Sequence, residues 1–114
     1  MAILIALMQH PVLGRSVEYA DNRISLYAAQ KGRCAITGQE LSLDEIHCHH
    51  KKPVRAGGTD SYFNLVIVHV QVHRLIHATD PARINSYLAD LNLSPAMLKK
   101  VNKFREMASL KPIS

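Results

Sequence analysis

Apolar residues recur at helical spacing in the first third of the chain. Between residues 16 and 31, Ile24, Tyr27 and Ala28 share one helical face, a serine precedes the pattern and Gly32 follows it. Serine is a favoured N-cap and glycine a favoured stop, so an N-terminal helix is predicted over about residues 16–31. The apolar opening "MAILIALM" is too short to cross a bilayer, and it predicts a buried strand or helix instead.

Two more helices are predicted near the C-terminus, because each opens with its own capping signal. Asp-Pro introduces residues 81–91 and Ser-Pro introduces residues 95–109. The first residue of each pair can cap a helix, and proline fits the first helical turn. The second of these helices carries an apolar stripe, which predicts burial against a core: Met97, Leu98, Val101 and Phe104.

The central third of the chain changes to short extended segments. "IHCHHKK" ends at a proline and "NLVIVHV" is rich in β-branched residues, so both predict strands. The loop between them contains Gly57 and Gly58, which adopt positive φ at little steric cost. "QVHRLIHA" then returns to helical spacing. The predicted fold class is therefore α+β, with a motif core at about residues 45–80.

Length and composition fit a small globular protein. At 114 residues, the chain predicts a single domain spanning residues 1–114. Its 47% hydrophobic and 20% charged residues are typical of globular rather than disordered chains. Two cysteines, Cys34 and Cys48, cannot build a disulfide framework, so a cytoplasmic location is predicted.

The net charge favours an anionic partner. Fourteen Lys and Arg residues against nine Asp and Glu residues give a charge of +5. The excess gathers in residues 47–77 and again from residue 91 onward, where the cations are Lys99, Lys100, Lys103, Arg105 and Lys111. A solvated helix face explains the second group equally well, so charge alone does not establish nucleic-acid binding.

Six of the seven histidines lie between residues 47 and 77. His73 and His77 are four residues apart, so on a helix they can offer two imidazoles to one metal ion. His49 and His50 are neighbours in a predicted strand, where adjacent side chains point to opposite sides. An imidazole that gives its lone pair to a metal cannot also accept a proton. The doublet can therefore divide metal binding from base catalysis, and hydrolysis of a phosphodiester needs both.

The number of ligands separates two kinds of metal site. Three histidines leave positions open for catalysis, whereas a structural zinc site is closed by four protein ligands. Cys34 and Cys48 are fourteen residues apart, unlike the closely spaced cysteines of zinc fingers. The alternative is a non-catalytic nucleic-acid-binding module with a structural zinc, in which Cys48 or His69 supplies the fourth ligand.

The histidine doublet with "KKP", the pair Gly57–Gly58, then Asn64–Leu65 and His73-x3-His77, resembles the HNH, or ββα-metal, nuclease motif. A longer stretch, from "SVEYADNRISLYAAQKGRCAITGQEL" to "KKVNKFR", is similar to the C-terminal HNH domain of bacterial group II intron reverse transcriptase/maturases. Many of these domains carry paired cysteines for a structural zinc, and Thr37 stands here at the second position. The resemblance implies a small ββα-metal (His-Me finger) core with flanking helices.

The same resemblance implies roles for individual residues. It implies one divalent ion, Mg²⁺, Mn²⁺, Zn²⁺ or Ni²⁺, with three ligands: His49, His73 and His77. His50 resembles the general base, and Asn64 resembles the residue that ties down the loop and holds that base in place. His47 and His69 are expected as surface residues or as residues behind the ligands. Charge and position alone predict the nucleic-acid contacts Lys51, Lys52, Arg55 and Arg74.

The function implied by the resemblance is a metal-dependent DNA endonuclease of the bacterial cytoplasm. It would hydrolyse phosphodiester bonds and nick target DNA in connection with group II intron mobility. The expected partner is DNA, contacted mainly through its backbone, with group II intron RNA and a fused or parental reverse transcriptase as further partners and no membrane. A second alternative is a maturase accessory that binds intron RNA without cutting DNA.

Overall fold

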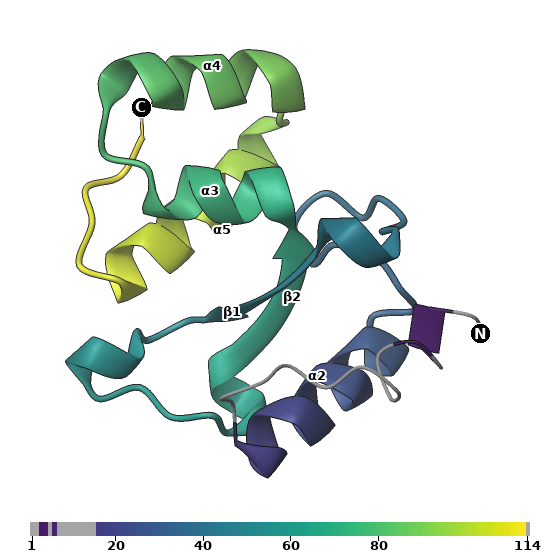
Figure 1. Cartoon of the computed structure of the whole chain (residues 1–114). Helices are drawn as coiled ribbons and strands as arrows, with labels where there is room; N and C mark the ends of the chain where they lie inside the picture. The colour runs from purple at the N-terminus through teal and green to yellow at the C-terminus, as the bar shows by residue number, and fades with distance from the viewer. Residues whose placement is uncertain (1–2, 5, 7–15, 114) are drawn as a thin grey trace.

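The computed structural model describes residues 3, 4, 6 and 16–113 (Figure 1). The prediction for the opening "MAILIALM" lies largely outside these residues. The elements follow one another as helix α2 (Val17–Ala29), strands β1 (Ile46–His50) and β2 (Leu65–His69), and helices α3 (Val70–His77), α4 (Pro81–Leu91) and α5 (Pro95–Met107). The predicted α+β class is confirmed, because two strands are followed by a helix and flanked by further helices.

The two strands form an antiparallel pair that positions the histidine doublet. Ile46 pairs with His69 at one end, and His50 pairs with Leu65 at the other, where the long loop connects them. Helix α3 continues directly from the end of β2, so β1, β2 and α3 make one ββα unit. Figure 1 shows α2 on one side of the strand pair and α3, α4 and α5 on the other.

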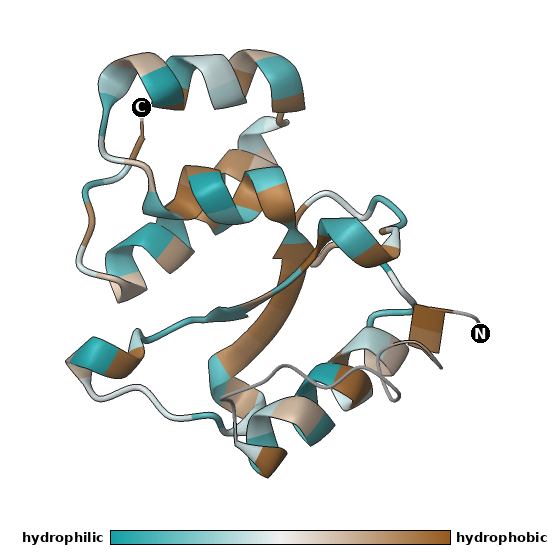
Figure 2. Ribbon diagram, viewed as in Figure 1, coloured by the Kyte–Doolittle hydropathy of each residue, from teal (hydrophilic) through white to brown (hydrophobic). Residues whose placement is uncertain are grey.

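The hydrophobic core is centred on β2 and α3. Four successive residues of β2, from Leu65 to Val68, are buried, as expected for a strand covered on both faces. Figure 2 shows this strand as apolar along its length, whereas β1 is mostly polar. Helix α3 buries Val72, Leu75 and Ile76, which leaves its two histidines on another face of the helix. The core therefore fixes the direction in which those histidines point.

Helix α2 begins where the sequence predicted, but it buries a different face. The Ser16 hydroxyl accepts a hydrogen bond from the Tyr19 amide at 2.9 Å, as an N-cap does. Tyr19 and Leu26 are the buried residues of the helix, while Ala28, predicted on the core face, is exposed. The helix lacks a strong apolar stripe, so its contact face follows from tertiary packing rather than from spacing.

Helices α4 and α5 follow their predicted capping signals. The Asp80 carboxylate accepts from the Arg83 amide, and the Ser94 hydroxyl accepts from the Met97 amide. The predicted bounds 81–91 match α4, and α5 ends two residues before the predicted position 109. No helix in the described part of the chain is long and apolar enough to span a bilayer. A single domain over all 114 residues stays a prediction.

The apolar stripe of α5 is only partly buried, and one of the tail cations is buried with it. Val101 is fully buried, and Met97 and Phe104 pack against the core, whereas Leu98 is not part of it. Arg105, expected on a solvated or nucleic-acid-facing side, is only 3% exposed. Burying the Arg105 guanidinium requires hydrogen-bond acceptors, and the last turn of α3 supplies them.

Candidate metal centre and catalytic cleft

The loop between the strands is closed by the side chain of Asn64. Its amide nitrogen donates to the Thr59 carbonyl at 2.7 Å and to the Lys52 carbonyl at 3.1 Å, and its oxygen accepts from the Lys52 amide at 2.9 Å. The Asn64 carbonyl also accepts from the Lys51 amide at 2.8 Å. These bonds join the two ends of the loop immediately after His50.

Glycines allow this loop to turn tightly. Gly57 has a φ of +94°, in the left-handed region that suits glycine, as predicted, whereas Gly58 does not have the positive φ predicted for it. Gly58 is needed for a different reason, because a Cβ there would lie 1.8 Å from the Lys52 carbonyl oxygen. The backbone can pass this close to itself only at a residue without a side chain.

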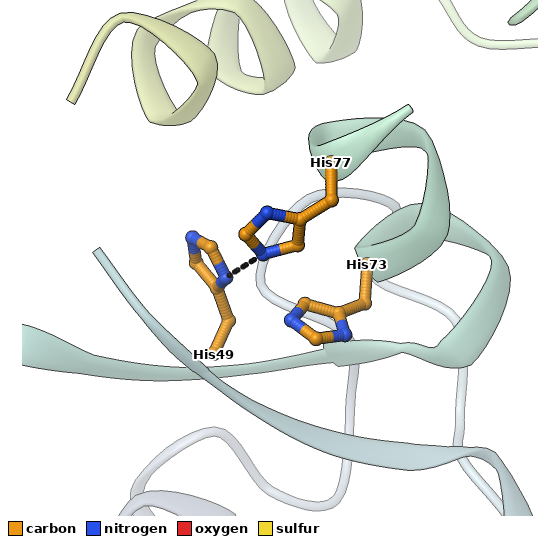
Figure 3. A group of neighbouring side chains, drawn as sticks. All are labelled: His49, His73 and His77. Atoms are coloured by element: carbon orange, nitrogen blue, oxygen red, sulfur yellow. Dashed lines mark hydrogen bonds between the residues drawn. The ribbon is translucent and has the colours of Figure 1, made fainter. Parts of the chain in front are cut away.

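Three histidines predicted as metal ligands lie together between β1 and α3 (Figure 3). His49 comes from the strand, and His73 and His77 come from successive turns of the helix. Figure 3 shows the three rings gathered in the space between these elements. One nitrogen from each ring lies within 4.8 Å of the others. Strand pairing and the buried face of α3 bring them together.

The spacing of these nitrogens fits one metal ion. Two nitrogens bound to a zinc ion at about 2.1 Å in tetrahedral geometry lie about 3.4 Å apart. His77 Nε2 and His49 Nδ1 are 3.3 Å apart. His73 Nδ1 is 3.0 Å from His47 Nδ1, so His73 Nε2 is the nitrogen left for an ion. The donor set is three imidazoles, which suits zinc, nickel and related ions.

His49 is buried, His73 is half-buried and His77 is exposed, and loss of water around the rings favours their neutral form. Burial, followed by the neighbouring imidazoles, lowers the pKa of His49 to about 3. The same causes lower the pKa of His73 to about 4. Burial also lowers the pKa of His77, and the charges of Arg55 and Arg105 lower it further. The lowered pKa of each ring favours the uncharged form, which metal binding requires.

The remaining histidines of the region are not part of this cluster. The hydrogen bond between His47 and His73 places His47 behind a candidate ligand, in agreement with one of the two predictions for it. His69 caps α3, because its Nδ1 accepts from the Gln71 amide, and its Nε2 bonds Glu45 at 3.0 Å. Within the described residues, neither His69 nor Cys48 belongs to the three-histidine group. The fourth ligand of the structural-zinc alternative is thus not among them.

His50 lies beside the three-histidine group in a shared cleft. The cleft has a volume of about 340 Å³, and its lining includes His50, His73 and His77. His50 Nε2 bonds the Asp60 carboxylate at 2.8 Å. Asp60 was not among the site residues predicted from the sequence.

Tyr19 is a second contact of His50 that sequence reasoning missed. The two rings stack with centroids 5.6 Å apart and an interplanar angle of 18°. Tyr19 belongs to α2, thirty-one residues away in sequence, and no local pattern connects the two.

Of the four cations predicted to contact nucleic acid, one lines this cleft and one lines a neighbouring cleft. Arg55 lines it and is exposed. Arg74 is exposed and lines a neighbouring cleft of about 810 Å³ together with His77 and Arg83. Lys51 is half-buried and its charge lowers the pKa of His49, after burial and the three neighbouring histidines, whereas Lys52 is exposed. Arg55 and Arg74 therefore have the most direct access to a ligand beside the histidines.

Comparison with known proteins agrees with this geometry. Residues 32–79 match the family model described as HNH endonuclease. The matched segment contains both strands, their connecting loop and α3, and it leaves out α2, α4 and α5. No curated protein and no solved structure gives a significant match.

Proposed function

Because residues 32–79 match the family model of HNH endonucleases, which are phosphodiester hydrolases, we propose that this chain is a metal-dependent DNA endonuclease. The observation that supports this most directly is the shared cleft, where His50 lies next to a three-histidine group suited to one divalent ion. A site of this kind can bind a phosphate and activate a water molecule in the same place.

The proposed roles separate metal binding from proton transfer. A divalent ion held by His49, His73 and His77 would neutralise charge on the scissile phosphate and on the leaving oxygen. His50 accepts the proton of the attacking water, because its lone pair is not used by the cluster. Asn64 holds the loop that follows His50. The family implies a divalent metal. Imidazole ligands bind Zn²⁺ or Ni²⁺ more tightly than Mg²⁺, and Mn²⁺ is tested alongside them.

The chain around the cleft would bind the DNA backbone. Arg55 and Arg74, which line the two neighbouring clefts, would contact phosphate oxygens. Lys51 and Lys52, at the start of the loop, add positive charge close to His50. Contacts of this kind position the duplex without reading its sequence. One such site hydrolyses one strand, so the proposed first product is a nick.

The proposed activity can be tested with supercoiled plasmid DNA. Wild-type protein, freed of metal and then given Mg²⁺, Mn²⁺, Zn²⁺ or Ni²⁺, should convert supercoiled plasmid to the open circular form with at least one of these ions. His50→Ala should lower kcat by about 10²–10⁴-fold, the usual loss when a general base is removed. It should bind the same ion, because His50 is outside the three-histidine group.

Two results would overturn this proposal. Wild-type protein that cuts DNA with none of the four ions is not an endonuclease of this type, and the binding-module alternative would then be favoured. Full activity of His50→Ala would show that His50 is not the base, although the protein would still be a nuclease. EDTA-treated protein is the control for metal dependence, and far-UV circular dichroism of His50→Ala is the control for folding.

The finer proposal concerns the biological setting of the activity. Similarity of the wider sequence to the HNH domain of group II intron reverse transcriptase/maturases supports nicking of target DNA during intron mobility, in the bacterial cytoplasm. A chain with only two cysteines suits such a reducing compartment. Added group II intron RNA should then direct nicking to the intron insertion site. Binding of intron RNA without any DNA cleavage would instead support the maturase-accessory alternative.

A further inference from the structure

We infer that Asp60 is a positioning residue for His50 and that helix α2 completes this side of the active site. The inference rests on the proposed function, because it concerns the residue proposed there as the general base. Helix α2 lies outside the matched segment 32–79. The inference therefore adds residues from beyond this segment to those that affect the rate of the proposed DNA cleavage.

The contact between Asp60 and His50 is short and largely shielded from water. Asp60 Oδ1 lies 2.8 Å from His50 Nε2. The side chain of His50 is 13% exposed and that of Asp60 is 24% exposed. A charge-assisted hydrogen bond is stronger when little water competes for its donor and acceptor. The loop closed by Asn64 carries Asp60 and holds it at this distance.

This bond fixes the tautomer of His50. An ionised carboxylate only accepts hydrogen bonds, so His50 Nε2 must carry the proton that it donates to Asp60. In a neutral imidazole the other nitrogen, Nδ1, then holds the lone pair. A base with its lone pair on a defined nitrogen is ready to take a proton from water. Without Asp60 the proton could move from Nε2 to Nδ1. Nδ1 would then have no lone pair with which to accept a proton from water.

Helix α2 holds Asp60 from behind through its first turns. The Ser16 hydroxyl donates to Asp60 Oδ2 at 2.6 Å while accepting from the Tyr19 amide at 2.9 Å. The Asn22 side chain donates to the Asp60 carbonyl at 2.8 Å. Both oxygens of the carboxylate are thus engaged, one by the imidazole and one by the helix cap. The cap of α2 and the orientation of Asp60 depend on the same hydroxyl.

The same helix also restricts the plane of the imidazole. Tyr19 is 6% exposed and its ring stacks on His50 almost in parallel, at 18°. Asp60 therefore fixes the ring from its edge, and Tyr19 fixes it from its face. Because α2 supplies Ser16, Tyr19 and Asn22, it takes part in orienting the proposed base, although it lies outside the family match.

Substitution of Asp60 in the full chain tests its role. Asp60→Ala should lower kcat for plasmid nicking by about 10–100-fold, by analogy with the loss of a hydrogen-bond partner that orients a metal-ligating imidazole. KM and the affinity for Zn²⁺, measured by calorimetry, should stay within about 2-fold, since Asp60 is outside the metal cluster. Asp60→Asn, which keeps a hydrogen-bond acceptor, should lose less. Asp21→Asn, at an exposed position of α2, is the matched control for charge and should match wild type.

Substitution of Ser16 separates orientation from helix capping. Ser16→Thr keeps both the donor and the cap, so it should match wild type within about 2-fold. Ser16→Asp still caps α2, but it cannot donate to Asp60 and adds a second negative charge beside it. It should lower kcat by about 10-fold while the helical circular dichroism is unchanged. Equal activity of these two variants would remove the Ser16 hydroxyl from the proposed role.

A spectroscopic readout decides the inference independently of activity. Nitrogen NMR of the imidazole rings should show His50 as the Nε2–H tautomer in wild type, with a slowly exchanging Nε2 proton. In Asp60→Ala this proton should exchange rapidly and the Nδ1–H tautomer should become populated. If Asp60→Ala keeps wild-type kcat and an unchanged His50 spectrum, the inference is wrong. Loss of nuclease activity in His50→Ala would still uphold the proposed function in that case, so the two failures are distinguishable.

Discussion

Most imidazoles in the central region have one ring nitrogen bound to a neighbouring group, and this determines what the other nitrogen can do. His73 Nδ1 faces His47, and His50 Nε2 faces Asp60. His69 has both nitrogens occupied, because one accepts from the start of α3 and the other bonds Glu45. His69 is therefore unsuited to metal binding or proton transfer, while His73 and His50 each keep one nitrogen for chemistry.

Glu45 accepts hydrogen bonds from two neighbouring residues, and the contribution of its charge to the stability of the protein can be tested by changing the pH. Hydrogen bonds from the amide and hydroxyl of Ser42, and then from His69, lower the pKa of Glu45 to about 2 from its ordinary 4.5. A lowered carboxyl pKa adds stability that is present above about pH 4.5 and is lost as the pH falls towards 2. Glu45→Gln should therefore have a lower melting temperature than wild type at pH 7, and the difference should vanish near pH 2.

The size of this effect and its control follow from solvent exposure. Water screens the Glu45 side chain, so the difference at pH 7 should be small. Glu106→Gln, at an exposed position of α5, should show no such difference at either pH. Thermal melts of wild type, Glu45→Gln and Glu106→Gln between pH 2 and pH 7 measure these differences in melting temperature. A Glu45→Gln difference that is equally large at both ends of this range would show that the charge is not its cause.

At the scale of elements, α3 determines the geometry of the candidate metal site, because it carries two of the three histidines. Its C-terminal end is held by Arg105 of α5, whose Nη1 donates to the carbonyls of Leu75 at 2.9 Å and Ala78 at 2.7 Å. A cation at this end of a helix also interacts favourably with the helix dipole. Arg105 Nε donates to the Lys111 carbonyl at 2.7 Å, so the C-terminal segment is joined to the same group.

Removal of this guanidinium should loosen α3. Arg105→Met leaves buried carbonyl groups without donors and should lower the free energy of unfolding by about 2–4 kcal/mol. Arg105→Lys, which keeps the charge but has fewer donors in a different geometry, should fall between Arg105→Met and wild type. Lys103→Met, at an exposed position of the same helix, should change the free energy by less than about 0.5 kcal/mol.

Urea unfolding in the presence of EDTA measures these differences without a contribution from metal. Zinc affinity of the same variants should follow the same order, because α3 holds His73 and His77 in place. Equal stability of Arg105→Met and Lys103→Met would show that the buried hydrogen bonds of Arg105 do not stabilise the helix end.

At the scale of the whole molecule, a metal ion would connect parts that are far apart in sequence. His49 lies in β1, whereas His73 and His77 lie in α3, after the long loop and β2. Helix α2 packs on the other side of the strand pair, against His50 (Figure 1). An ion bound at the three-histidine group would therefore join β1 to α3, and it would bind only when the ββα unit is folded.

Metal binding should consequently raise the melting temperature. A ligand that binds only the folded state stabilises it by about 2.7 kcal/mol at a concentration of 100 Kd. For a protein of this size that corresponds to a rise of roughly 10 °C with Zn²⁺ or Ni²⁺, reversed by EDTA. His77→Ala should lose most of the rise. His69→Gln should keep it even if its baseline is lower, since His69 is outside the group.

Differential scanning fluorimetry at several metal concentrations tests this. A rise of the same size in His77→Ala and wild type would show that the ion binds elsewhere, and no rise in wild type with any of the four ions would contradict the site itself.

Much of the fold and of the candidate site was predictable because the responsible signals are local. Ser16, Asp80 and Ser94 cap helices at the predicted places, since a cap involves only residues within one turn. The pair His73 and His77 lies on one helix face because a helix repeats every 3.6 residues. Predicting that His49 joins them needed the family resemblance, because strand register depends on pairing with a distant segment.

The sequence by itself determined the helices, the strands and the types of residue that can bind metal and accept a proton. Only the tertiary structure decided that Arg105 is buried against α3 and that Asp60 and Tyr19 hold His50. These contacts join residues ten to thirty-one positions apart across different elements. Capping and periodicity act within a few residues, whereas such pairs meet only after loops close and faces pack, and no local pattern specifies that.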